Sequence, residues 1–198
     1  MSPFKHTTKE KTEIRERILS TAWQMVKEDG WESLSIRKIA GAVDYSIPVI
    51  YDHFENKEAI VYEFARQGFQ MLAKAIGKAI EKHDDPAEKI RAVAHAYWKF
   101  AVKHKEHYAL MYGMGMAGCE IEKCFPERAD FRKMVMKPIN DIVAKGNNPD
   151  VHPYLKYFTF WSILHGLISI RSLNSNVSDE VNKMVMDDAV AGFIKNLG

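Results

Sequence analysis

The sequence predicts an all-α protein with a small N-terminal domain and a larger helical domain, about nine helices in total. Apolar side chains recur every three or four residues over most of the chain, which is the period of a helix with one buried face. Short polar segments containing Gly or Pro separate these stretches. No segment alternates apolar and polar residues as a half-buried strand would, and the chain contains no Asn-Gly hairpin turn.

Bulk composition restricts the class of protein without naming a function. Of the 198 residues, 46% are hydrophobic and 27% are charged, which is typical of a folded globular chain. The start has no signal-peptide core, no apolar stretch reaches membrane-spanning length, and two cysteines do not make a disulfide framework. We therefore expect a cytoplasmic protein without a membrane partner. Residues 1–57 contain nine basic and nine acidic side chains, so a bound polyanion must be held by positioned groups.

Two helices are expected before residue 44. The first has an apolar stripe on one face and ends at Gly30, where a left-handed backbone is expected. Ser35 is the expected N-cap of a short second helix that runs to Val43. We expect Ala40 to lie where this helix crosses the next one closely. The side chains expected to face inward are Ile36, Ile39, Ala40 and Val43.

A turn and a third short helix follow. Asp44 takes the place where a turn often has glycine, and Asp tolerates a left-handed backbone better than most residues. Ser46 is expected to cap a helix over Ile47–Phe54, with Pro48 in its first turn. The spacing over Ser35–Phe54 predicts a helix-turn-helix, which is suited to placing a helix end in the DNA major groove.

Six further helices are expected, divided by capping residues and glycines. Their expected bounds are 57–81 capped by Asn56, 87–103 capped by Asp85, 105–112, 126–145 with a kink or break at Pro138, Asp150 or His152 to Leu173, and 178–196 capped by Ser178. The glycine-rich residues 113–125 are expected to form a loop.

Several short segments in the N-terminal region together form a specific pattern. They are Ser35-Ile-Arg-Lys-Ile-Ala40, Tyr45-Ser46, Val49-Ile-Tyr51, His53-Phe54 and Lys57-Glu-Ala-Ile60. This pattern resembles the DNA-binding signature of the TetR family of repressors, and the likeness continues without a gap from Ile14 to Ile60. The resemblance implies a DNA-binding domain over residues 1–60 and a ligand-binding and dimerisation domain over residues 61–198.

The resemblance also implies roles for individual residues. Tyr51 and His53 would contact phosphates, and Lys57 would do so from the N-terminal end of the fourth helix. The surface formed by Ile47, Pro48 and Val49 is apolar, which favours contacts with thymine methyl groups and recognition of DNA shape. The full set implied to contact DNA is Ser35, Arg37, Tyr45, Ser46, Ile47, Pro48, Val49, Tyr51, His53 and Lys57.

The C-terminal region is rich in aromatic residues and methionine around the glycine-rich segment. Such residues at helical spacing form a packed core, and they can also line a plastic apolar cavity. In the resembled family this region encloses the pocket for a small-molecule effector. The candidate ligand-binding residues are Phe69, Tyr97, Trp98, Met111, Met114, Tyr157, Trp161 and His165.

A second resemblance concerns the segment Trp161-Ser-Ile-Leu-His165-Gly166, which is similar to one subgroup of TetR-like C-terminal domains. Trp161 and His165 are expected to share a helix face, and Gly166 to permit close helix approach. His165 is either a hydrogen-bonded core residue or a ligand contact. The last two helices are broadly apolar, and the resemblance implies a homodimer formed through them. Such a dimer would place two recognition helices ~34 Å apart on a near-palindromic DNA operator.

Three other classes of protein fit the sequence less well. A metal- or redox-responsive regulator would use Cys119 and Cys124, although neither residue lies in a tight metal-binding spacing. An enzyme is not expected, because no phosphate-binding glycine loop, nucleophile elbow or paired carboxylates occur; no catalytic residue, metal or cofactor is therefore assigned. A purely architectural DNA binder would not need so large an apolar helical region.

Overall fold

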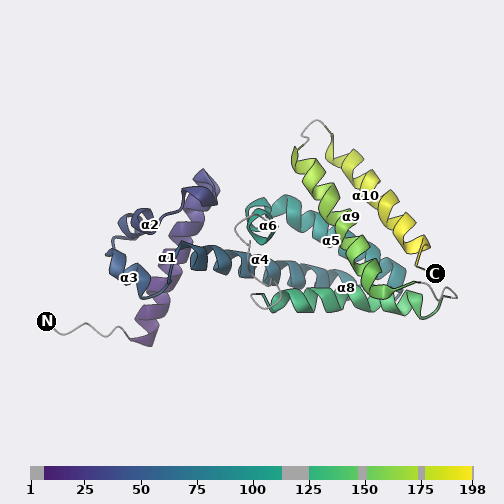
Figure 1. Ribbon diagram of the computed structural model, residues 1–198, viewed down its shortest axis with the longest axis horizontal. Helices are drawn as coiled ribbons and strands as arrows, with labels where there is room; N and C mark the ends of the chain where they lie inside the picture. Colours follow the sequence, from purple (N-terminus) through teal and green to yellow (C-terminus); the bar gives the residue numbers. More distant parts are fainter. Residues whose placement is uncertain (1–6, 113–124, 147–150, 174–176, 198) are drawn as a thin grey trace. The chain divides into compact units, whose positions relative to one another are not determined.

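The computed structural model describes residues 7–112, 125–146, 151–173 and 177–197, and within these ranges it contains helices and no strand (Figure 1). The bounds of its elements are α1 Thr8–Asp29, η1 (a 3-10 turn) Trp31–Ser33, α2 Ile36–Val43, α3 Ile47–Tyr51, α4 Lys57–Ile80, α5 Pro86–Lys103, α6 Lys105–Tyr112, α8 Glu127–Val143, α9 Pro153–Leu173 and α10 Asp179–Lys195. The predicted all-α class is confirmed. The predicted loop over residues 113–125 lies almost wholly outside the described ranges.

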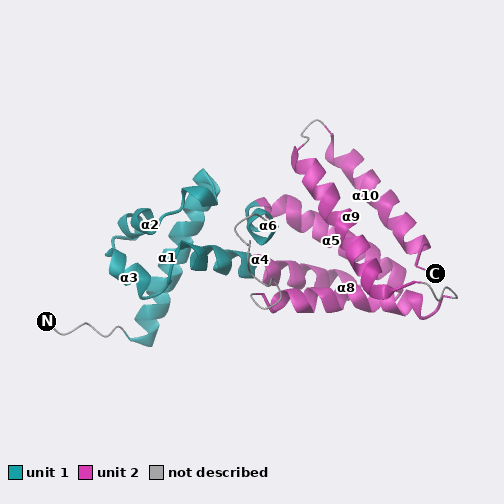
Figure 2. Cartoon of the chain, in the orientation of Figure 1, with its two compact units in different colours: residues 1–67, 106–118 teal, residues 68–105, 119–198 magenta. Residues whose placement is uncertain are grey.

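The chain forms two compact units (Figure 2). The first consists of residues 1–67 and 106–118, and the second of residues 68–105 and 119–198. Helix α4 continues without interruption across the boundary after Gln67. The division into functional domains at residue 60 stays a prediction.

Side-chain caps explain where most helices begin. The hydroxyl of Ser35 accepts a hydrogen bond from the amide of Lys38 at 3.2 Å, as predicted for the start of α2. Asn56, Asp85 and Ser178 cap α4, α5 and α10 in the same way. Each cap satisfies an amide at the helix start that has no partner within the helix. Cap chemistry therefore made these boundaries predictable.

Two expected interruptions differ in the structure. Gly30 has a positive φ of 79°, but its ψ of 161° lies outside the left-handed helical region that was predicted. Pro138 neither ends nor divides α8, which runs through it from Glu127 to Val143. The expectation of a break there is wrong, and the alternative of a kink stays a prediction. Pro138 lies on the same buried face as Phe131 and Val135, and this packing offsets the hydrogen bond that proline cannot donate.

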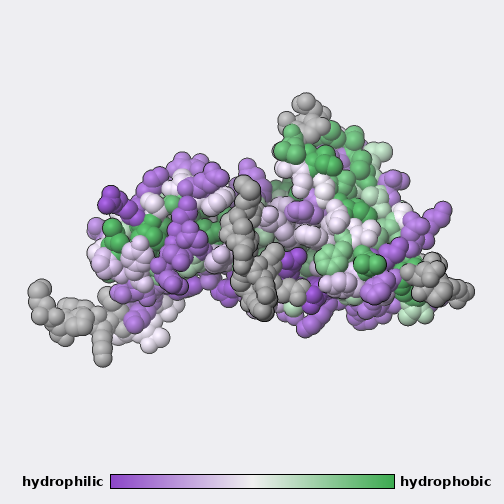
Figure 3. All heavy atoms as spheres, viewed as in Figure 1, coloured by the Kyte–Doolittle hydropathy of each residue, from purple (hydrophilic) through white to green (hydrophobic). Residues whose placement is uncertain are grey.

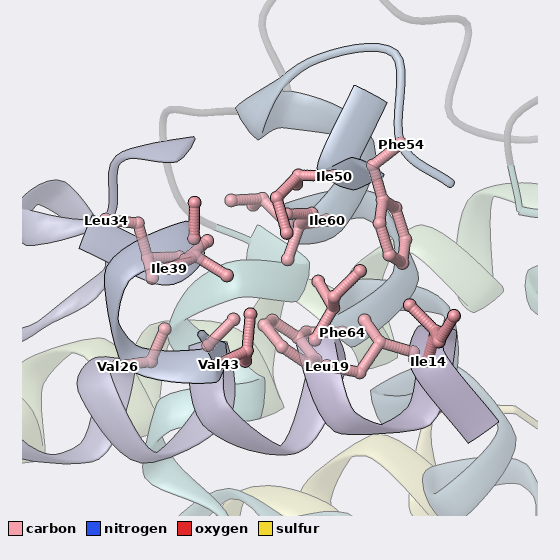
Figure 4. Packing of buried hydrophobic residues seen from close by; sticks show 14 of the residues in the cluster. Ile14, Leu19, Val26, Leu34, Ile39, Val43, Ile50, Phe54, Ile60 and Phe64 are labelled. Carbon is pink, nitrogen blue, oxygen red and sulfur yellow. The ribbon is translucent and has the colours of Figure 1, made fainter. Parts of the chain in front are cut away.

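The first unit has a continuous apolar core of its own (Figure 4). The stripe on α1 that the sequence predicted is buried except for Met25, which is half-buried. Helix α2 contributes Ile39, Ala40 and Val43 to the same core. Ile50 of α3 and Phe64 of α4 complete it. The predicted inward position of Ile36 is only partly confirmed, because this side chain is half-buried against the core.

The second unit packs the later part of α4 with α5, α8, α9 and α10. Aromatic pairs join its helices: Tyr97 of α5 lies 6.1 Å from Phe131 of α8 between ring centroids, and Phe160 of α9 lies 5.0 Å from Phe193 of α10. Helices α9 and α10 run side by side (Figure 1). No helix among the described residues is long and apolar enough to cross a membrane.

Candidate nucleic-acid interface

The turn between α2 and α3 is fixed by the backbone conformation of one residue. Asp44 adopts φ 59° and ψ 41°, and it is the one non-glycine residue with positive φ among those described. The amide of Tyr45 then donates a hydrogen bond to the carbonyl of Ala40 at 3.1 Å, which closes the end of α2. The left-handed conformation predicted for Asp44 is confirmed, and it ends α2 before the turn that leads into α3.

Helix α3 is shorter than predicted. Its regular part ends at Tyr51 rather than Phe54, although the amides of His53 and Phe54 still donate hydrogen bonds to the carbonyl of Ile50. Ser46 stands at the N-cap position, but its side chain makes no capping hydrogen bond. The burial of Phe54 draws the chain back to the core, and Asn56 then caps α4. Tertiary packing therefore ends this helix.

The exposed side of α3 is the candidate contact surface. Ile47 is 38% exposed and Tyr51 is 53% exposed, although both are large apolar or aromatic side chains. Ser46 and Pro48 are exposed beside them. These exposed side chains form the surface of α3 that the sequence predicts to contact DNA.

Two of the residues predicted to face the groove are held partly in the core. Tyr45 and Val49 are half-buried and pack against the core of the first unit. On α2, Arg37 is exposed and Ser35 is half-buried at its N-cap position. His53 is half-buried. The structure thus brings most of the predicted DNA-contacting set to α2, α3 and the turns that flank them.

Three cations stack on aromatic rings around these helices. The guanidinium of Arg15 lies 4.9 Å from the centroid of Phe54, and that of Arg17 lies 5.5 Å from the centroid of Tyr45. Lys57 lies 5.4 Å from the Trp31 ring, and its ammonium donates to the carbonyl of Glu32 at 3.2 Å. Sequence reasoning identified none of these pairs, because cation–π contacts leave no local spacing signal.

A carboxylate clasp joins α1 to α4 within the first unit. Glu63 accepts a hydrogen bond from Arg15 at 2.9 Å and another from Arg66 at 2.6 Å. Burial raises the pKa of Glu63, but the hydrogen bonds and charges of Arg66 and Arg15 outweigh this and hold that pKa below its usual value. The clasp fixes α1 against the helix that leads into the second unit.

The residues predicted to bind a ligand are divided between the units. Phe69, Tyr97 and Tyr157 are buried in the second unit, whereas Met111 is buried in the first. Trp98 is half-buried, and the ring of Trp98 lies 5.8 Å from the guanidinium carbon of Arg171. Met114 lies outside the described residues, as do Cys119 and Cys124. Their assignment to a ligand or a redox site stays a prediction.

Trp161 and His165 share a helix face, as predicted. Their rings stack with centroids 5.1 Å apart, and the guanidinium carbon of Arg128 lies 5.6 Å from the Trp161 centroid. Burial lowers the pKa of His165, which favours its neutral form. Gly166 makes no close helix contact within the described chain, since an added Cβ there would meet none of its atoms within 4 Å, and the predicted close approach stays a prediction.

The outer faces of α9 and α10 are apolar and exposed. Figure 3 shows hydrophobic side chains gathered over these two helices. The exposed large apolar residues on and beside them are Tyr154, Leu155, Phe158, Ile170, Leu173, Val177, Val181, Met184 and Val185. Among the described residues, no group of three or more His, Cys, Asp or Glu could hold a metal ion.

Comparisons with known proteins identify the family to which this architecture belongs. Residues 18–64 match the family described as "Bacterial regulatory proteins, tetR family", and residues 90–183 match "Tetracyclin repressor-like, C-terminal domain". The chain is similar to the HTH-type nicotine-responsive transcriptional repressor HdnoR of Paenarthrobacter nicotinovorans, with 26% identity over 135 residues, 66% of each protein. The matched segments span 46% to 73% of the lengths of the curated relatives.

Solved structures agree with the sequence matches. The chain superposes on a protein of unknown function from Rhodococcus sp. RHA1 with a TM-score of 0.77 and 22% identity, covering 99% of this chain and 98% of that one. It also superposes on PfmR, a TetR family transcriptional regulator from Thermus thermophilus, with a TM-score of 0.66 and 25% identity, covering 88% and 97%. With its helix-turn-helix on an independent core, the chain belongs to the tetR family of bacterial regulatory proteins.

Proposed function

We propose that this protein is a ligand-responsive transcriptional repressor that binds a near-palindromic operator as a homodimer. A small apolar or aromatic effector would release it. The observation that carries this proposal is the exposed face of α3, where Ile47 and Tyr51 lie in solvent on a helix anchored by a separate core. A regulator of this kind acts in the cytoplasm, where the DNA is. No catalytic role is part of the proposal.

The contacts with DNA divide into two kinds. The Tyr51 hydroxyl, Arg37 and Lys57 would hold phosphates and fix the register of the protein. Lys57 already donates to the Glu32 carbonyl, but its ammonium has further donors for a phosphate at the start of α4. The exposed Ile47 and Pro48 present carbon atoms to the groove. These favour thymine methyl groups, so we expect an operator with A·T pairs under α3.

Selection of bound DNA fragments followed by anisotropy titrations tests this division. Arg37→Gln should weaken binding to all sequences and reduce the slope of log K against log salt by about 1. Ile47→Ala should reduce discrimination at contacted T positions and leave that slope unchanged. Lys27→Gln is the matched control, because Lys27 is an exposed cation elsewhere on the same unit. Invariant G·C pairs under α3 would contradict the predicted readout, and no selected operator at all would contradict DNA binding.

The exposed faces of α9 and α10 support the proposed homodimer. A second copy would cover the apolar side chains there, in a four-helix arrangement. Gly166 and Gly192 face open space within the described chain, and both would allow the backbones of two copies to approach closely. Two copies related by a two-fold axis would present two recognition helices to a palindromic site.

Light scattering after gel filtration tests the homodimer. Met184→Glu places a charge at the most exposed large apolar residue of α10 and should yield a monomer with unchanged helix content. Ala144→Glu, at an exposed position after α8, is the control and should remain dimeric. A Met184→Glu protein that stays dimeric would show that the interface lies elsewhere.

Helix α4 supports a route from effector to DNA. It begins in the first unit and continues into the second as one helix. An effector that binds the two states of the protein unequally would shift α4 and with it the paired DNA-binding units, and coupling of ~1–3 kcal/mol is typical of such systems. The test is a screen of apolar and aromatic compounds for release of the selected operator. Compounds that bind the protein and leave operator affinity unchanged would refute the coupling.

A further inference from the structure

The second unit carries a basic groove that none of the proposed contacts uses. It is an open groove of about 690 Å³ between the later part of α4 and α5. This volume lies within the range of small-molecule sites. Its rim holds lysines from both sides, namely Lys74, Lys78, Lys82, Lys99 and Lys103. None of the candidate ligand residues that the structure describes is among those that line it.

These lysines are not neutralised by the rest of the described chain. All five are exposed, and within that part of the chain no carboxylate lies in ion-pair range of their ammonium groups. Elsewhere on the second unit lysines do pair, as Lys137 does with Asp141 at 2.9 Å. No described residue lining the groove is acidic. Like charges one helical turn apart repel each other, so an anion bound in the groove would relieve this repulsion.

The floor of the groove is apolar. Small side chains on both helices, Ala75, Ala79 and Ala96, keep it low, and the buried Phe100 closes one side. The ring of His104 packs against Phe100 with a centroid distance of 5.2 Å. A flat or hydrocarbon group can therefore lie along the floor while the lysine ends surround it.

We propose that this groove binds an organic polyphosphate, a small molecule that joins several phosphate charges to an apolar or aromatic group. The lysine ammonium groups would hold the phosphates, and the alanine floor would receive the organic group. Lys74 and Lys78 lie one turn apart on α4, ~6 Å along the helix, and Lys82 follows just beyond the helix end at Ile80, so the cations match a chain of phosphates better than a single one. Nucleotides and coenzyme A share this chemistry.

Isothermal titration of the full chain tests the site without any DNA, so its outcome is independent of the proposed repressor function. The probes are ATP, coenzyme A and inorganic tripolyphosphate in separate titrations at about 0.15 M salt, where long-range attraction is screened. We expect saturable binding of at least one organic probe, tighter than that of tripolyphosphate. Whichever of ATP and coenzyme A binds more tightly indicates whether the natural ligand is a nucleotide or a coenzyme A compound. Absence of saturable binding for all three would overturn the proposal.

Two double variants separate the groove from general charge effects. Lys78→Gln/Lys99→Gln removes one cation from each wall and should weaken the organic probe at least tenfold. Lys133→Gln/Lys145→Gln removes the same charge from exposed positions outside the groove and should change the affinity less than twofold. Circular dichroism should show unchanged helix content in both. Equal weakening by the two variants would overturn the site.

Two further experiments test the alanine floor of the groove and DNA as a competing partner. Ala79→Phe should weaken the organic probe and leave tripolyphosphate unaffected, because it fills the floor and keeps the lysines; no change in the organic probe would overturn the assignment of the floor. A random-sequence DNA duplex that displaces the probe from wild type, and binds Lys78→Gln/Lys99→Gln less well, would assign the lysines to nucleic acid and overturn the small-ligand proposal.

Discussion

The Glu63 clasp gives a prediction that the structure makes quantitative. Glu63→Gln keeps the shape of the side chain and removes the negative charge that Arg15 and Arg66 share. In the native protein the carboxylate accepts a bond of 2.9 Å from Arg15 and one of 2.6 Å from Arg66. The bond to Arg15 connects α1 with α4, whereas Arg66 lies one turn from Glu63 on α4 itself. Loss of both bonds should weaken the folding of the first unit.

The expected loss of unfolding free energy follows from how exposed Glu63, Arg15 and Arg66 are. A sheltered hydrogen bond to a charged group contributes about 1.5–3 kcal/mol, whereas an exposed ion pair contributes about 0.2–1 kcal/mol. The Glu63 side chain is 12% exposed, but those of Arg15 and Arg66 are 39% and 43% exposed and are rehydrated when the carboxylate is lost. We expect a loss between these limits, about 1–2 kcal/mol of unfolding free energy at pH 7.

Urea denaturation followed by circular dichroism measures this loss. With a slope of about 2 kcal/mol per molar urea, the midpoint should fall by about 0.5–1 M. The pKa of Glu63 is lowered in the folded protein, so its stabilisation is fully present above the ordinary value of 4.5 and is lost as the pH falls through the folded pKa. The difference between wild type and Glu63→Gln should therefore shrink in acid.

Glu13→Gln is the matched control. Glu13 lies on α1 and, like Glu63, faces a cation, but its side chain is 63% exposed and the Lys9 ammonium is 3.9 Å away. Its replacement should change stability by less than about 0.5 kcal/mol. Equal midpoints for wild type and Glu63→Gln at pH 7, or a deficit that persists unchanged in strong acid, would refute the reasoning.

Three further sets of substitutions test the structure. Asp44→Val should lower the unfolding free energy by about 1–2 kcal/mol in urea denaturation, because a β-branched residue resists the left-handed backbone. Asp44→Gly should lower it less. Equal losses would contradict the argument that the positive φ of Asp44 determines the cost. Ala40→Leu should lower the unfolding free energy by about 1–3 kcal/mol, because it overpacks the buried crossing of α2 with its neighbour. Gly41→Ala adds a Cβ to open space and should raise the unfolding free energy by about 0.5–1 kcal/mol. An unchanged stability of Ala40→Leu would show that this crossing is loosely packed. Burial lowers the pKa of His165, so this residue should titrate below 6.5 by NMR, and the stability of the protein should fall as the pH drops below 6.5. His165→Phe should remove that part of the fall in stability. A pKa of His165 above 6.5 would contradict the burial argument.

The sequence predicted the features that depend on near neighbours. Caps at Ser35, Asp85 and Ser178 follow from a side chain and an amide three residues later, so local sequence is sufficient. The left-handed Asp44 was predictable for the same reason. Pro138 was misjudged because the packing that carries α8 through it comes from distant helices, which local rules do not include.

For the candidate site, the sequence by itself determined that a short helix-turn-helix exists and which residue types it presents. Only the tertiary structure decided which of them remain accessible: it leaves Ile47 and Tyr51 in solvent and holds Tyr45 and Val49 against the core. It alone revealed the Glu63 clasp and brought the lysines of α4 and α5 to one groove. The physical reason is the separation along the chain of the residues that interact. Caps and turns involve atoms within one helical turn of each other, whereas exposure and charge clustering arise from contacts between residues far apart in the chain.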